Sequence, residues 1–276
     1  MTETGMVRSG QGAAWLPEDF GAMLDVVVQA KSVAANASTL FNTNKQKVGF
    51  PLWVADPAVG WYGELDEITP ADGDTEEVVV TPSKTAGLTL LSSELVDDSD
   101  PAIANQVAAA LANQIAQAID TAFFGNTTTK GPNGLLSLSS TAVDTGASVA
   151  NLDAFISARY AAEAHSAKLT HWLMSPATAE ALSKLKVASG SNQSLLQFVD
   201  DGITVAGLPV LTSTHVDATT VAWGVDKSQL RYVLRSGTTV ERFPSVTNDG
   251  QHVRAISRVG FGFLNPAGVV RLYDAA

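Results

Sequence analysis

Residues 100–126, DPAIANQVAAALANQIAQAIDTAFFGN, form the clearest pattern in the chain. Asp100 suits a helix N-cap, Pro101 suits the first helical position, and Gly125 with Asn126 can end a helix. Between these signals, large apolar residues recur at every fourth position: Ile103, Val107, Leu111, Ile115, Ile119 and Phe123. The spacing predicts a helix over residues 101–124, roughly 36 Å long, that acts as a spine for elements packed across it.

The segment before this helix, residues 48–86, contains too many Pro and Gly residues for a helix. Its first part reads FPLWVADPAVGWYGEL (50–65), and its second part, EEVVVTPSKTAGLTLL (76–91), is rich in β-formers. We predict a long irregular hairpin that turns near Pro70–Asp74, with arms of about 18 residues that reach roughly 60 Å. Because a compact chain of this length has a radius of gyration of about 19 Å, the hairpin would project beyond its own domain.

Opposite charges gather in two separate regions. Residues 48–83 contain eight acidic residues and no Lys or Arg, a net charge of −8. Residues 227–271 contain seven basic and two acidic residues, a net charge of +5. Aromatic residues on a projecting loop are costly to leave in water, so we predict that the hairpin of one copy lies on the basic region of a neighbouring copy. Reversing Glu64, Asp66 and Glu67 to Lys should then impair assembly.

The candidate contact residues follow from these two regions. In the hairpin they are Trp61, Glu64, Asp66, Glu67, Asp72 and Asp74. In the basic region they are Arg231, Arg235, Arg242, Arg254 and Arg258.

The flanking regions are less distinctive. Residues 1–16 are small, polar and Gly-rich, which predicts an arm that orders only against another surface, followed by a helix. Residues 126–150 resemble a surface loop, and from residue 151 helical and β-rich segments alternate. Gly260-Phe261-Gly262 lies inside a β-rich run, where we expect a strand or a close-packing feature.

Composition excludes several function classes. The 276 residues carry a formal net charge of −11, which argues against sequence-specific binding of DNA or of an acidic membrane face. The chain has no Cys, so disulfides, thiolate zinc sites and Cys nucleophiles are absent. The N-terminus lacks the apolar stretch of a signal peptide, and no apolar run is long enough to span a membrane, so we expect neither export nor a membrane partner. Charged residues make up 16% of the chain, against about 25% in typical proteins, so much of the surface is expected to be neutral or covered.

No motif indicates catalysis. The four His residues lie far apart in sequence, and no phosphate-binding loop occurs. The tightest cluster of carboxylates is formed by Glu94, Asp97, Asp98 and Asp100. These residues could form an acid/base pair or a calcium site. They directly precede the spine helix, however, and the positive end of a helix dipole stabilises negative charge, which favours a structural role. We predict no catalytic residues, no metal and no cofactor.

The order of these elements resembles the major capsid protein of tailed double-stranded DNA bacteriophages, with the α+β Hong Kong 97-type fold. The residues that carry the resemblance are the Trp-x-Gly-Glu pattern at Trp61–Glu64, the stretch from Lys84 to Ser93-Glu94-Leu95, and the turn from Asn126 to Pro132-Asn133-Gly134. The segments WLMSPATAEALSKLK and ITVAGLPVLTS also look like this family's axial-domain helix and its Gly-x-Pro-Val strand.

The resemblance implies a division of the chain. Residues 1–46 would be the N-terminal arm and its helix, and residues 47–87 the extended E-loop. Residues 88–130 and 230–265 would form the P-domain with the spine helix, and residues 131–229 and 266–276 the A-domain.

The resemblance also implies partners and a location. Copies of the chain would assemble as pentamers and hexamers into an icosahedral shell that encloses the genome without reading its sequence. The hairpin lacks the Lys that some family members use for a covalent cross-link, so cross-linking is not expected here. A separate scaffolding protein, a portal and a decoration protein would be partners, and assembly would occur in the cytoplasm of the host bacterium.

Two other functions are compatible with the sequence. An encapsulin, a cellular shell of the same fold, would load protein cargo instead of DNA. An α+β enzyme would use the Glu94–Asp100 carboxylates, and would need a pocket that no motif predicts.

Overall fold

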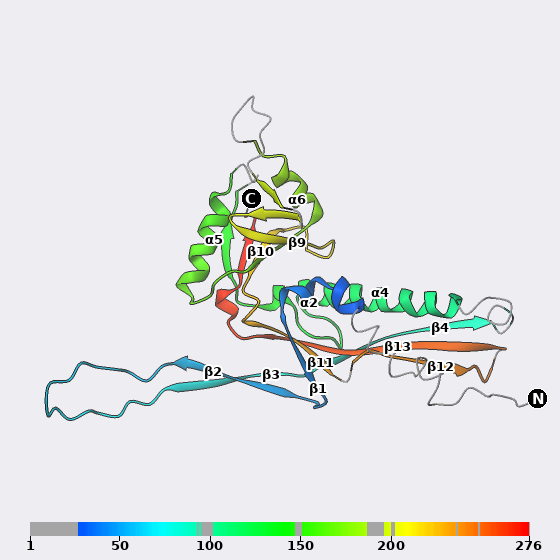
Figure 1. Ribbon diagram of the computed structural model, residues 1–276, viewed down its shortest axis with the longest axis horizontal. Helices are drawn as coiled ribbons and strands as arrows, with labels where there is room; N and C mark the ends of the chain where they lie inside the picture. Colours follow the sequence, from blue (N-terminus) through cyan, green and yellow to red (C-terminus); the bar gives the residue numbers. More distant parts are fainter. Residues whose placement is uncertain are drawn as a thin grey trace, which may run out of the picture.

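The computed structural model describes residues 27–92, 94, 102–146, 151–186, 196–199, 202–235, 237–247 and 249–275. A long hairpin projects from one side of the molecule, an elongated sheet lies beneath a long helix, and a second sheet with two helices stands beside them (Figure 1). The predicted mixture of helices and strands is therefore confirmed. The helices are α2 (Val33–Ala37), α4 (Ala102–Phe124), α5 (Asp153–Ala164) and α6 (Pro176–Ser183), with 3-10 turns η2 (Leu135–Ser137) and η3 (Pro266–Gly268).

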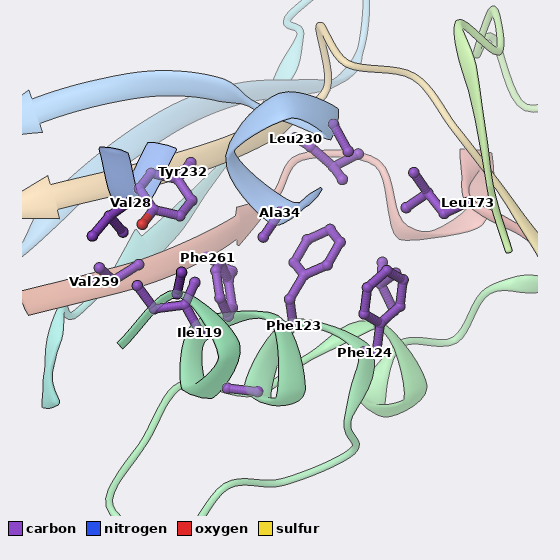
Figure 2. Packing of buried hydrophobic residues seen from close by; sticks show 14 of the residues in the cluster. Val28, Ala34, Ile119, Phe123, Phe124, Leu173, Leu230, Tyr232, Val259 and Phe261 are labelled. Carbon is purple, nitrogen blue, oxygen red and sulfur yellow. The ribbon is translucent and has the colours of Figure 1, made fainter. Parts of the chain in front are cut away.

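Helix α4 confirms the predicted spine. It ends where Gly125 N–H donates to Thr121 O (3.0 Å); the predicted cap, Asp100, and Pro101 lie outside the described residues. Its apolar side packs on the sheet, with Phe123 edge-on to Phe261 (ring centroids 5.2 Å apart; Figure 2). Phe123 is completely buried, so the helix and the sheet share one core.

The elongated sheet has five strands. Its order is β1 (Thr39–Thr43), β11 (Leu230–Arg235), β13 (Gly250–Phe263) and β12 (Thr239–Pro244), and β4 (Ser83–Ser92) pairs with β13. The 14-residue strand β13 pairs with β4 over ten positions, and with β12 and β11 in succession along its opposite edge. Strands β1 and β12 were not predicted from sequence.

The projecting hairpin is formed by β2 (Val48–Ala55) and β3 (Asp74–Val80), which pair antiparallel from Val48–Val80 to Ala55–Asp74. The prediction of a turn near Pro70–Asp74 was wrong, because Asp74 begins β3 and a turn lies at Gly63–Asp66 instead. There the Asp66 carboxylate accepts a hydrogen bond from Gly63 N–H (2.6 Å).

The predicted second arm of the hairpin, residues 76–91, is also split by the structure. Strand β4 belongs to the five-stranded sheet, although Ser83–Gly87 fall within the expected E-loop boundaries. Pro82, between β3 and β4, has no N–H for a sheet ladder. Alternate residues of β4 face α4, and Leu111 approaches Gly87 closely, so packing against the helix holds β4 in this sheet.

Gly260 and Gly262 allow the base of the hairpin to cross the sheet. A Cβ at Gly260 would lie 2.7 Å from Val80 Cγ1 and 3.2 Å from Pro82 Cα, and a Cβ at Gly262 would lie 2.9 Å from Val80 Cγ2. The predicted strand and the predicted close packing are both present at this position.

Substituting Gly260 by Ala is therefore expected to destabilise the subunit by about 1–3 kcal/mol, because the added methyl group overpacks the hairpin base. Chemical denaturation of the unassembled subunit measures the effect. Gly60→Ala serves as the control, because it adds the same methyl group where the nearest atom to the new Cβ, in the Tyr62 ring, is 3.4 Å away, an ordinary van der Waals contact. A Gly260→Ala subunit as stable as wild type would contradict this account of the crossing.

The second sheet has seven strands. Their order is β5 (Thr141–Asp144), β14 (Val270–Tyr273), β10 (Thr220–Val225), β6 (His171–Met174), β9 (Leu208–Thr212), β8 (Gly202–Val205) and β7 (Gln197–Val199). The helix–strand alternation predicted from residue 151 is confirmed, whereas β5 lies in a segment interpreted as a loop. Trp172 is buried against Phe155 of α5 and donates to Val205 O (2.9 Å).

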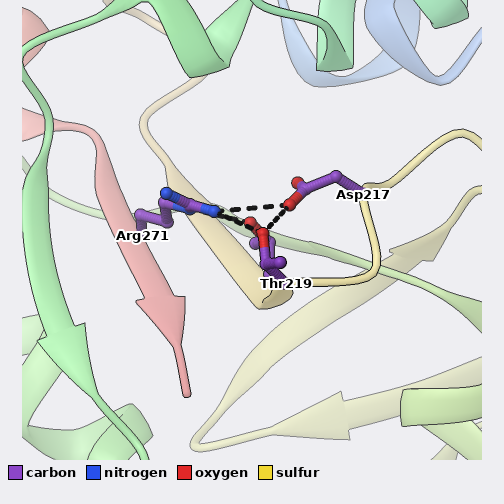
Figure 3. Close-up of polar contacts among 4 residues, drawn as sticks. Asp217, Thr219 and Arg271 are labelled. Atoms are coloured by element: carbon purple, nitrogen blue, oxygen red, sulfur yellow. Dashed lines mark hydrogen bonds and ion pairs between the residues drawn. The ribbon is translucent and has the colours of Figure 1, made fainter. Parts of the chain in front are cut away.

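Arg271, counted above among the basic residues, is held within this second sheet (Figure 3). Its guanidinium donates to Thr220 Oγ1 (2.7 Å) and Thr219 Oγ1 (2.9 Å), and pairs with Asp217 (3.3 Å). It also lies over the Trp223 ring. Arg271 therefore joins β14 to the loop before β10 and leaves the set of cations available for docking.

A buried carboxylate attaches the N-terminal part of the described chain to α4. Asp120, 5% exposed, accepts hydrogen bonds from Ser32 Oγ (2.7 Å), Val33 N–H (3.0 Å) and Ala34 N–H (3.1 Å). These are donors at the start of α2, which the helix itself leaves without partners. Residues 27–31 are helical, and the rest of the predicted N-terminal arm and helix lies outside the described residues.

Candidate assembly surfaces

The distal half of the hairpin exposes an unusual amount of apolar side chain. Trp61 and Leu65 are fully exposed, and Trp53 is 67% exposed. Further large apolar residues exposed in the hairpin are Val54, Val59, Tyr62, Ile68 and Val79. A contiguous run of this kind indicates a surface that another molecule covers.

The predicted acidic residues lie on the same segment. Glu64, Asp66, Glu67, Asp72 and Asp74 are all exposed. In the described part of the chain none of them forms a salt bridge, and Asp66 alone has a structural role, in the Gly63 turn. The hairpin therefore presents carboxylates and apolar groups side by side.

The predicted arginines do not all share one surface. Along β13, Ala255, Val259 and Phe261 pack in the α4 core, so Arg254 and Arg258 face the opposite side. In the β11–β13 register Arg231 pairs with Gly262, which is on the same side of β13 as Arg254 and Arg258. Arg235 lies four residues after Arg231 on β11, so its side chain is on the same side, and both arginines face away from α4. Arg242 pairs with buried Val253 and lies on the α4 side, so its assignment to the common surface was wrong.

Lys84, which was not among the predicted contact residues, also belongs to this surface. It lies directly across from Arg258 in the β4–β13 ladder. We call the surface formed by Lys84, Arg231, Arg235, Arg254 and Arg258 the cationic face. Glu241 also lies on it, so five cations and one carboxylate leave a net charge of +4.

The cations differ in how far they are already neutralised. Arg254 pairs with Glu241 and lies over the Phe243 ring. Arg231 donates to Ser228 O, and the buried Nε of Arg235 has no hydrogen-bond partner. Among the described residues, no carboxylate pairs with Arg235, Arg258 or Lys84, which lie in a row across β11, β13 and β4. Like charges placed opposite one another are unfavourable, so this row favours an anionic partner.

Catalytic or metal-binding geometry is not evident in the described residues. Glu94 is exposed, whereas Asp97, Asp98 and Asp100 lie outside the described residues. Over the ranges that the structure describes, no three His, Cys, Asp or Glu side chains gather at one point. His171 has its pKa lowered by burial and by the nearby charge of Lys227, and its Nδ1 contacts Thr170. No helix in the described ranges is long and apolar enough to cross a membrane.

Comparison with protein families gives one match, and it covers most of the chain. The model of the phage capsid family matches residues 12–273. No curated protein sequence matches the chain at a significant level.

Solved structures that are similar to this chain include capsids of GTA particles and structures from phages. The chain is similar to the capsid of an empty GTA particle (TM-score 0.78, 22% identity, 89% of this chain and 90% of that chain). It is also similar to structures from Mycobacterium phage Bobi (TM-score 0.70, 15% identity, 89% and 91% covered) and Gordonia phage Cozz (TM-score 0.71, 17% identity, 89% and 87% covered). The Hong Kong 97-type fold expected from the sequence is confirmed.

Proposed function

The chain belongs to the phage capsid family, and from this premise we propose how its copies join: the acidic hairpin of one copy lies on the cationic face of its neighbour. The chain is a structural major capsid protein of a virion shell, and it is not an enzyme. The family match does not favour the encapsulin or the carboxylate enzyme.

The observation that carries the proposal is that one chain exposes two surfaces of opposite charge, the acidic hairpin and the cationic face. The hairpin has exposed acids and exposed aromatic residues, and the cationic face has a row of cations to which no described residue offers a carboxylate partner. A protein that repeats one contact around a closed shell needs such a self-complementary pair. The candidate contacts are Trp61, Glu64, Asp66, Glu67, Asp72 and Asp74 on the hairpin, and Lys84, Arg231, Arg235, Arg254 and Arg258 on the face.

The root of the hairpin supports a contact between copies. Val48 and Val80 pack on Val233, which lies on the cationic face of their own subunit, and the hairpin then extends away from the molecule (Figure 1). Its tip therefore lies far from its own cations. A neighbouring copy can supply them.

We propose that these contacts build pentamers and hexamers of an icosahedral shell around double-stranded DNA. The net charge of −11 limits adhesion of the enclosed DNA to the shell. The hairpin has no Lys between Val48 and Ser83, so its contacts are non-covalent. A separate scaffolding protein, a portal and a decoration protein are the proposed partners, and the host cytoplasm is the proposed place of assembly.

Electron microscopy of particles formed by this chain, with the absorbance ratio at 260 and 280 nm, tests this function. Large uniform shells with the absorbance of DNA are expected. Small shells filled with protein would instead indicate the encapsulin function. A chain that stays monomeric even with its scaffolding protein supplied would overturn the proposal.

A further inference from the structure

A cavity of about 190 Å³ lies where the C-terminal half of α4 meets β4, β13 and the loop 128–132. Its apolar lining comes from Ala118, Ile119, Ala122, Val259 and Phe261. Its polar lining includes Ser83, Thr129, and two cations, Lys84 and Lys130. A dry cavity of roughly 150 Å³ holds a benzene molecule, so this one has room for a large apolar side chain.

The hairpin carries one large apolar side chain, Leu65, that is not packed into an apolar site of the described residues. Leu65 is fully exposed and has φ +72°, a left-handed conformation that a branched side chain adopts only under strain. The turn from Gly63 to Asp66 holds it there, at the part of the hairpin farthest from the sheet. Because Leu65 is fully exposed, no packing against the described residues offsets this strain, and such strain is typical of residues that act in binding.

We propose that the cavity receives Leu65 of a neighbouring copy, so that the hairpin tip is anchored by an apolar side chain in a socket. The inference rests on the proposed function and adds to it the place where the tip ends. Charge supports the choice of occupant, because Glu64, Asp66 and Glu67 flank Leu65, while Lys84 and Lys130 flank the cavity.

The row of cations on the cationic face ends at β4, the strand that also borders the cavity. Arg235, Arg258 and Lys84 follow one another across β11, β13 and β4, and Lys84 also lines the cavity. Three neighbouring strands span about 10 Å. The unpaired part of the hairpin, residues 56–73, has about nine residues on each side of its tip and can extend roughly 30 Å. The cavity lies on the α4 side of the sheet, so a hairpin that crosses the row of cations on the opposite side reaches the cavity by passing over the outer edge of β4.

Disulfide trapping tests the contact directly, because the chain contains no Cys. Full-length chains carry Leu65→Cys together with Thr129→Cys, or Leu65→Cys together with Ser83→Cys, on the two sides of the cavity. A disulfide forms only when the two Cα atoms lie within about 7 Å. Assembled shells of at least one pair are expected to give ladders of linked chains on a non-reducing gel. The control combines Tyr160→Cys, on exposed α5, with Thr129→Cys and should give no ladder.

Side-chain variants test whether assembly needs a large apolar side chain at Leu65. Leu65→Gly removes the strain and the side chain together, whereas Leu65→Met keeps a large apolar group. We expect Leu65→Gly to raise the protein concentration needed for assembly by roughly tenfold or more, and Leu65→Met to assemble almost normally. Val246→Ala, at a fully exposed position outside the hairpin, should have little effect.

The two proposals fail in different ways. If shells form but both cysteine pairs give no more cross-linking than the control, or give only bonds within one chain, the socket is wrong and the docking of the hairpin on the cationic face still stands. If Leu65→Gly assembles like wild type, the socket is also wrong. If no shells form from the wild-type chain, the proposed function itself fails.

Discussion

Shell assembly is expected to be lost when Glu64, Glu67 and Asp72 are all replaced by Lys, while the subunit itself folds normally. All three acids are exposed and make no salt bridge with a described residue, so the fold does not depend on them. Asp66 is kept because its carboxylate holds the turn at Gly63. Each charge pair at about 4 Å is worth about 1 kcal/mol in water and more where it is partly buried, and reversal turns attraction into repulsion. Assembly should therefore weaken by more than about 100-fold.

Charge exchange provides the decisive control for this prediction. Adding Arg235→Glu and Arg258→Glu to the triple variant restores opposite signs across the contact and should restore assembly. Asp153, Glu163 and Glu180 lie exposed on α5 and α6, and replacing them with Lys changes the net charge equally but should leave assembly intact. Light scattering during assembly measures all variants. The defect should shrink in 1 M salt, where the Debye length falls to about 3 Å.

A triple variant that assembles like wild type would refute the electrostatic contact. A defect that the charge exchange leaves unchanged would show that the acids act on some surface other than the cationic face.

The second large effect is expected at Asp120. Asp120→Ala leaves Ser32 Oγ, Val33 N–H and Ala34 N–H without their buried acceptor. Unsatisfied buried donors cost about 1–3 kcal/mol each, and partial exposure of α2 relieves some of that cost. We expect a loss of about 3 kcal/mol and a fall in Tm of roughly 6–10 °C.

Two comparisons isolate the role of this carboxylate. Asp120→Asn keeps one acceptor oxygen and should lose about half as much stability. Asn113→Ala removes only the exposed contact with Lys31 and should change stability by less than about 0.5 kcal/mol. Thermal unfolding of the unassembled subunit gives the stabilities, and the rate of tryptic cleavage at Lys31 reports release of the segment. Equal stability of Asp120→Ala and Asn113→Ala would show that Asp120 does not anchor α2.

Position along the strand decides which of the predicted arginines lie on the same side of the sheet. The sequence shows that residues 227–271 are basic, but a count of charges contains no information about faces. In β13 the alternation of buried and exposed residues could have placed Arg254 and Arg258 together. Arg242 and Lys84 required the register of β12 and β4 against β13, which are separate segments of the chain. Arg271 required the position of the loop that carries Asp217.

The sequence by itself determined the elements whose signals are local: the spine helix, with its four-residue apolar repeat and terminal Gly125, the existence of a projecting hairpin, and the separation of acidic from basic segments. Short-range periodicity, the glycine that ends the helix and local composition are enough for these features. Tertiary structure alone decided which cations share a face, how Asp120 meets α2, and where the cavity near Lys84 lies. These features depend on strand register and on packing between residues far apart in the chain, and no local pattern encodes such pairings.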